Sequence, residues 1–225
     1  MPLLTALEII KSSPLTKDFP PSKLCPIIED EEYLWFENCA LGIPLYNALI
    51  DKLTPIPDNI QAWKKSKTYT TNDHVSYYGS LLKATKPNVV VDPCEDTDNS
   101  WAEVPKFVDT CLNNFWKTIR VALSYRIVAD NVTIFTYELS GKGSTKYSED
   151  FRNNATGNIT VERGERYDLQ NAISLKADKF YNALLSRLLV AAETCETLKL
   201  ATYYQQSCGD KCLTKNTTKR IHFLN

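Results

Sequence analysis

The stretch that decides the fold is residues 168–207, DLQNAISLKADKFYNALLSRLLVAAETCETLKLATYYQQS. It contains no Gly or Pro, and its apolar residues recur every three or four positions, which is the spacing of one helix face. This face consists of Leu169, Ile173, Ala177, Phe180, Leu184, Leu188, Ala191, Cys195 and Leu198. Asp168 suits the start of a helix and Gly209 suits its end. The pattern therefore predicts one long amphipathic helix.

The length of this predicted helix raises a question about its surroundings. Each residue adds about 1.5 Å, so an unbroken helix would be about 60 Å long, which exceeds a compact domain of this size. One outcome is a helix that kinks or projects beyond its own domain to meet a second surface. The other is an ordinary core helix that ends near Leu200.

Composition narrows the classes of protein. The chain has 225 residues, 43% of them hydrophobic, which suits one large domain or one domain plus a small module. Its net charge of −1 argues against a global attraction to nucleic acid or anionic lipid. No run of about 18 apolar residues occurs, so we expect no membrane span. The opening MPLLTALEIIKSS is amphipathic and contains Glu8, unlike a secretory signal.

Seven cysteines are present, an odd number without a regular spacing. With no secretory signal, we expect free thiols in a reducing compartment. Cys208 and Cys212 form a lone pair, with His222 as a conceivable third ligand, whereas a structural zinc site needs four ligands. We therefore predict no metal site.

The residues before this stretch also contain helical patterns. The N-terminal part predicts helices over 1–13, over 28–41 with an acidic first turn, and over 44–53 after a stop at Gly42. After residue 105, the pattern predicts a helix over 106–129 and a strand over 132–139. A long polar loop follows over 140–166, with a short strand at 158–162. Its glycines lack the spacing of a phosphate-binding loop.

Between the helical parts the patterning changes to period two. Residues 60–105 are rich in β-branched and aromatic residues and carry turn signals at Asn72-Asp73 and Tyr78-Gly79. They predict strands near 66–69, 74–78 and 80–84. The expected architecture is mainly α: a discontinuous helical domain, residues 1–57 and 106–225, interrupted by a small all-β module at 60–105.

This module resembles the chitin- and cellulose-binding modules of carbohydrate-binding families 5 and 12. The matching residues are Ala62, Trp63, Tyr69, Asp73, Val75, Tyr77, Gly79, Ala84, Pro93, Trp101 and Val104. The sequence departs from the family at Leu82, where a Tyr is usual, and at residues 85–87, which replace an exposed Trp pair. Candidate sugar-contacting residues are Trp63, Tyr77 and Tyr78. Because the Trp pair supplies most of the stacking surface, we expect weak or absent binding.

No catalytic arrangement is recognisable. The two histidines, His74 and His222, have no nearby nucleophile or carboxylate in a known pattern. We therefore predict that the protein is not an enzyme and uses no cofactor.

The helical layout is similar to the head–tail connector proteins of tailed bacteriophages, in particular the ring proteins of crAss-like phages that infect Bacteroidetes. The resemblance lies in LLTALEIIK, in IIEDEEYLWFENCALGIPLYNALIDKL and in LQNAISLKADKFYNALLSRLLVAAETC. It implies a structural virion protein, made in the bacterial cytoplasm. It further implies a ring, commonly of twelve copies, that contacts the portal and other tail proteins. Viral DNA would pass through the ring non-specifically.

The expected assembly contacts are the long helix, the 140–166 loop and a basic tail, residues 211–225, which contains no acidic side chain. The residues singled out are Leu188, Lys211, Lys215, Lys219 and Arg220. Two alternatives remain: a carbohydrate-binding protein that attaches to a surface glycan through the 60–105 module, and a hydrolase that uses this module for targeting.

Overall fold

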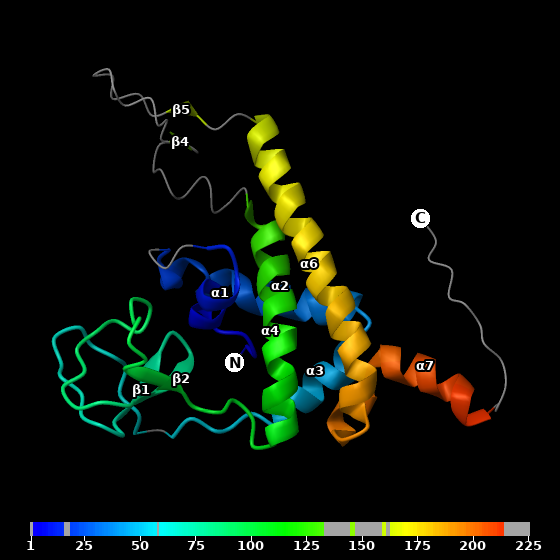
Figure 1. Ribbon diagram of the computed structural model, residues 1–225, viewed down its shortest axis with the longest axis horizontal. Coiled ribbons are helices and arrows are strands. Elements are labelled where there is room, and N and C mark those ends of the chain that lie inside the picture. The colour runs from blue at the N-terminus through cyan, green and yellow to red at the C-terminus, as the bar shows by residue number, and fades with distance from the viewer. Residues whose placement is uncertain are drawn as a thin grey trace.

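The protein is mainly helical, with a small β module lying beside the helices (Figure 1). This computed structural model describes residues 2–15, 19–57, 59–132, 145–146, 159–160 and 163–213. The predicted fold class is therefore confirmed. The predicted strand over 132–139 falls, apart from Val132, outside the described residues, as does most of the 140–166 loop.

The helices follow the predicted order. They are α1 (Ala6–Ser12), α2 (Cys25–Asn38), α3 (Gly42–Asp51), α4 (Thr110–Asp130), α6 (Arg163–Ala192) and α7 (Thr202–Leu213), with short 3-10 helices η1 (Pro21–Lys23) and η2 (Glu196–Leu200). α1 begins with a capping box, in which the Thr5 side chain accepts from the Glu8 N–H and the Glu8 carboxylate accepts from the Thr5 N–H.

The core forms around α4 and α6, which lie side by side along most of their length (Figure 1). α6 buries Ile173, Ala177, Leu184 and Leu188, as the spacing predicts. Leu169 and Phe180, also predicted on this face, are 47% and 37% exposed. Phe180 instead packs against Tyr125 of α4, with ring centroids 4.8 Å apart.

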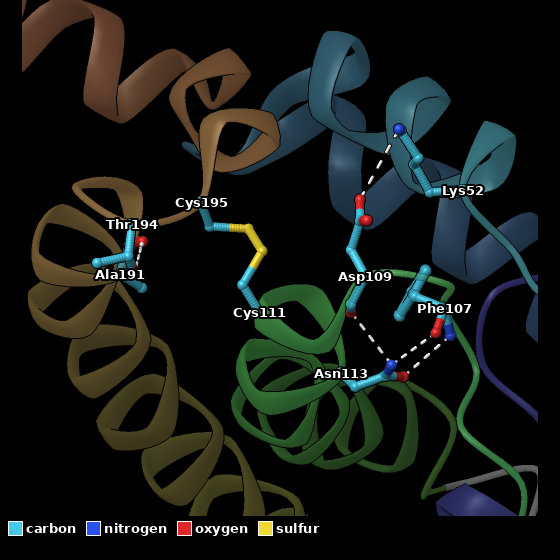
Figure 2. Close-up of a disulfide and its surroundings, with 8 residues drawn as sticks. All are labelled: Lys52, Phe107, Asp109, Cys111, Asn113, Ala191, Thr194 and Cys195. Carbon is cyan, nitrogen blue, oxygen red and sulfur yellow. Dashed lines mark hydrogen bonds and ion pairs between the residues drawn. A yellow bond between two sulfur atoms is a disulfide. The ribbon is translucent and has the colours of Figure 1, made fainter.

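The long helix does not continue to residue 207. α6 ends at Ala192, a turn at Glu193 and Thr194 follows, and the chain resumes as η2 and then α7. The physical reason lies at Cys195, which has an extended backbone (φ −133°, ψ 96°) and is bonded to Cys111 of α4 (Figure 2). The break turns the chain away from the α6 axis, and α7 leaves the helical body (Figure 1).

The Cys111–Cys195 disulfide corrects the prediction that all thiols are free. The two residues lie 84 positions apart, and the sequence gives no signal that the fold brings them together. Cys25, Cys39 and Cys94 are free. The disulfide thus ties the start of α4 to the end of α6.

Side-chain hydrogen bonds fix the entry into α4 close to this disulfide (Figure 2). Asn113 accepts from the Phe107 N–H at 2.9 Å and donates to the carbonyls of Phe107 (2.6 Å) and Asp109 (3.1 Å). Asp109 forms an ion pair with Lys52 at 3.8 Å. These contacts join the exit of the β module to the helical body.

Gly42 is required where α3 meets α7. Its φ is +79°, and a Cβ there would lie 2.2 Å from the Thr202 hydroxyl oxygen. Any larger residue would be strained and would collide with the start of α7. The backbone N–H groups of Thr202 and Tyr203 donate to the carbonyls of Leu41 and Ala40 at 3.1 and 2.7 Å.

A buried carboxylate holds the chain before α1. Glu32 of α2 is fully buried and accepts hydrogen bonds from the backbone N–H groups of Leu3 (2.7 Å) and Leu4 (2.6 Å). Burial raises the pKa of Glu32 to about 7, although these N–H groups and the Tyr46 hydroxyl favour the ionised form. The N-terminal segment is therefore anchored on a group that is costly to ionise.

The β module contains one antiparallel sheet of three strands, β1 (His74–Tyr77), β2 (Ser80–Ala84) and β3 (Trp101–Glu103), in that order. Tyr78 (φ 44°) and Gly79 (φ 84°) form the predicted turn between β1 and β2. The strand predicted near 66–69 is wrong, because only Tyr69 pairs there, in an isolated bridge with Val89. A second two-stranded pair joins β4 (Thr145–Lys146) to β5 (Ile159–Thr160), within the short strand expected at 158–162.

The module has its own small core but is not isolated from the helices. Its buried residues are Tyr69, Val75, Tyr77, Leu82, Ala84, Val89 and Trp101, joined by Leu7 of α1. The Thr5 and Ser80 hydroxyls lie 2.6 Å apart. Leu82, which replaces the usual Tyr, is a core residue. The division at 57–60 and 105–106 stays a prediction, and α1 contributes to both cores.

We predict that the disulfide contributes substantially to stability. Cys111→Ala should lower the free energy of unfolding by about 2–5 kcal/mol, because the cross-link restricts a long loop of the unfolded chain. Cys25→Ala, at an exposed free thiol, is the matched control. Alkylation without reductant, followed by mass spectrometry, should leave Cys111 and Cys195 unlabelled. Labelling of both, with no loss of stability in Cys111→Ala, would contradict the pairing.

We also predict a pH dependence that originates at Glu32. Its pKa is about 7 in the folded protein against 4.5 as the reference, so the folded state holds a proton that the unfolded chain releases. The free energy of unfolding should therefore fall by about 3 kcal/mol as pH rises from 4.5 to 7. Chemical denaturation of the wild type and Glu32→Gln across this range isolates the contribution. Parallel curves would show that Glu32 does not titrate there.

Candidate functional site

The three candidate sugar-contacting residues do lie together. Trp63 and Tyr77 have ring centroids 5.6 Å apart at an interplanar angle of 81°, and Tyr77 and Tyr78 are 4.8 Å apart at 89°. Tyr77 is buried and donates its hydroxyl to Asp92 at 2.7 Å, and only Tyr78 is exposed. Edge-to-face packing suits a small core, whereas a sugar needs flat exposed ring faces. The cluster therefore supports the module and offers one ring to solvent.

A polar junction connects the β module to the helices around Glu8. This buried carboxylate accepts from the Trp116 indole N–H at 2.8 Å and from the Thr5 backbone N–H at 2.9 Å. The Lys106 ammonium donates to the same carboxylate and lies 4.8 Å from the centroid of the Trp116 ring. Glu8 thus joins α1, α4 and the segment that leaves the module.

A second carboxylate, Glu103, lies at the edge of this junction. It pairs with Arg120 at 2.9 Å and with Lys11 at 3.4 Å. Burial raises the pKa of Glu103, but these two cations outweigh it and hold the pKa below its usual value. Burial lowers the pKa of Lys106, opposed by the Glu8 carboxylate. Both signs of charge are therefore present and paired.

A cavity of about 320 Å³ opens beside these residues, lined by Glu8, Glu103, Lys106, Trp116, Lys117 and Arg120 among others. Two carboxylates near one cavity resemble an acid–base pair, but a general acid needs a pKa raised towards the working pH. The pKa of Glu103 is lowered, and Glu8 is occupied by three internal donors. The junction is best explained as a structural contact that holds the β module against α1 and α4. Sequence reasoning missed it because its residues are scattered between positions 3 and 120.

The predicted assembly residues fall into two groups. Leu188 is fully buried in the protein's own core, so it is not available to a neighbouring copy, and its selection as an assembly contact is corrected. Its spacing on the helix identified the apolar face, but that face packs against α4. Lys215, Lys219 and Arg220 lie outside the described residues, and the Lys211 side chain is not described either.

The opposite side of α6 presents apolar residues to solvent. Leu175 and Val190 are 63% and 68% exposed, and the exposed Ala183 lies between them at spacings of eight and seven residues. At about 100° per residue the three side chains lie within about 80° of one another, on a side of the helix that also carries the exposed Lys179 and Ser186. We call the three apolar residues the outer stripe of α6. It lies on the longest helix of the described chain.

A groove of about 320 Å³ runs between α2, α4 and α6. Its apolar part includes Leu34, Trp35 and Ala177, and its charged residues are Glu31, Arg126, Asp130 and Asp178. Arg126 pairs with Asp130 at 2.8 Å and approaches Asp178 at 3.9 Å. With three carboxylates and one guanidinium, the groove is net negative.

The residues that the structure describes contain no group of three or more His, Cys, Asp or Glu side chains placed to hold a metal ion. None of their helices has the length and apolar character of a membrane span.

We predict that the protein is not retained on insoluble chitin or cellulose above background, because Tyr78 alone offers a ring face. A pull-down should compare the wild type with Tyr78→Ala and with a control, Val90→Ala, at another exposed residue of the module. Retention that Tyr78→Ala abolishes and Val90→Ala preserves would support the sugar-binding alternative. Trp63→Ala is less informative, because it removes packing against Tyr77.

Comparisons with protein-family models, with curated proteins and with solved structures found no match to this chain. Its function is therefore inferred from its own residues and geometry.

Proposed function

We propose that this chain is a structural virion protein that assembles into a ring in the portal–tail connector of a tailed bacteriophage. The observation that carries the proposal is the two-sided character of α6. One side is buried in the protein's own core, and the outer stripe of Leu175, Ala183 and Val190 faces solvent. A long helix that exposes apolar residues opposite its buried face suits a subunit that packs helix to helix against a copy of itself.

The position of α7 supports the same proposal. α7 extends away from the helical body (Figure 1), although Tyr203 and Tyr204 in its first turn pack against the core. In a ring, such a protruding helix reaches a neighbouring copy. The resemblance of the helical segments to crAss-like phage ring proteins supplies the remaining expectations: commonly twelve copies, contact with the portal, and DNA passing through the bore.

The charge of the protein is compatible with this role. A net charge of −1 gives no strong global attraction to DNA, which suits a channel that DNA must traverse without being held. The β module lies to one side of the α4–α6 pair, away from α7 (Figure 1). In the proposed assembly it decorates the ring and leaves the helical contacts free.

We predict that the outer stripe drives self-association. Leu175→Glu combined with Val190→Glu should raise the dissociation constant between copies at least about a hundredfold, because each side chain loses its apolar burial and gains a charge. Both positions are more than 60% exposed in the single copy, so its melting temperature should change little. Analytical ultracentrifugation measures the association, and negative-stain microscopy shows whether rings form, alone and with the portal protein.

The matched control is Val90→Glu, at an apolar residue of the β module that is 57% exposed. It adds the same charge at a comparable exposure and should leave assembly unchanged. Equal effects of the control and the α6 variant would mean that general charge, not the outer stripe, governs association. A wild-type protein that stays monomeric both alone and with the portal protein would overturn the proposed function.

A further inference from the structure

Part of the apolar lining of the groove between α2, α4 and α6 is exposed to solvent. Leu34, which lines the groove, is 49% exposed. Trp35 is half-buried and packs edge-on against Tyr181, with ring centroids 6.0 Å apart. An apolar groove bordered by charges is the usual form of a site for a short peptide segment.

The charge around this groove is net negative. Its three carboxylates, Glu31, Asp130 and Asp178, face one cation, Arg126, which is already paired. Asp178 is 63% exposed, so its second oxygen is open to a further partner. α2 itself contains Glu29, Asp30, Glu31, Glu32 and Glu37 and no Lys or Arg. The groove therefore favours a segment that is basic and carries apolar side chains.

Such a segment exists in this chain. Residues 214–225, TKNTTKRIHFLN, follow α7 and contain Lys215, Lys219 and Arg220 without any acidic residue. Phe223 and Leu224 supply apolar side chains directly after the basic ones. This segment is complementary to the groove in both charge and apolar character.

We propose that residues 214–225 of one copy bind in the α2–α4–α6 groove of a neighbouring copy. This inference rests on the proposed function, since it requires an assembly. The neighbouring copy is favoured because α7 protrudes from the body (Figure 1), so the segment begins outside it. Twelve residues extend to at most about 40 Å, enough to cross to an adjacent subunit.

Charge reversal tests the electrostatic part. Asp178→Lys and Lys219→Glu should each weaken self-association about fivefold, and more at low salt, because each replaces an attraction by a repulsion. Combining them restores an opposite-charge pair and should recover most of the loss. Glu193→Lys is the matched control, because this exposed carboxylate lies close to the end of α6 and outside the groove. Additive losses in the double variant would overturn the proposed contact.

Site-specific cross-linking tests the place and the source of the segment. The photoreactive analogue p-benzoylphenylalanine replaces Phe223 in a mixture of ¹⁵N-labelled and unlabelled copies. Cross-links should join residue 223 to α2 or to the middle of α6, and the linked peptides should carry different isotopes. Same-copy links, or links elsewhere in an assembled ring, would overturn this inference while the proposed function stands. Absence of any assembly would overturn both.

Discussion

The buried carboxylate of Glu8 is the interaction on which the arrangement of the parts depends. It closes the capping box of α1, accepts the Trp116 indole N–H of α4 and pairs with Lys106 where the chain returns from the β module. Removing one partner of a buried, hydrogen-bonded pair is costly, because the remaining charge stays desolvated. Glu8 therefore holds the helices and the module in one orientation, and the adjoining cavity follows from that orientation.

A second constraint acts at the far end of α6. The Cys111–Cys195 disulfide, the hydrogen bonds of Asn113 with Phe107 and the close contact of Gly42 with Thr202 all lie where α3, α4, α6 and α7 meet. Because Cys195 has an extended backbone after the turn at Glu193 and Thr194, α6 does not continue into α7. α7 therefore leaves the α6 axis and extends away from the helical body (Figure 1).

The proposed ring function would account for these features together. The contacts of Glu8 hold the β module to one side of the helices, and the outer stripe of α6 faces solvent. The acidic groove lies between α2, α4 and α6. In this arrangement apolar contacts between helices supply most of the affinity, and the basic segment after α7 tunes it. A groove and a tail on the same subunit generate a head-to-tail contact, which closes into a ring when the rotation between copies allows it.

Most of the secondary structure could be predicted from the sequence, because periodicity reports which local conformation buries apolar side chains. Spacing indicated the order of the helices and most of the buried face of α6, and the residue types at Tyr78–Gly79 indicated the turn, whereas the strand near 66–69 and a helix unbroken to residue 207 were wrong. The helix pattern placed Leu188 on the apolar face but did not name the partner of that face; the fold shows that it packs in the protein's own core against α4 and not against a neighbouring copy. Only the tertiary structure decided the Cys111–Cys195 bond and the residues around Glu8, which depend on contacts between positions far apart in the chain.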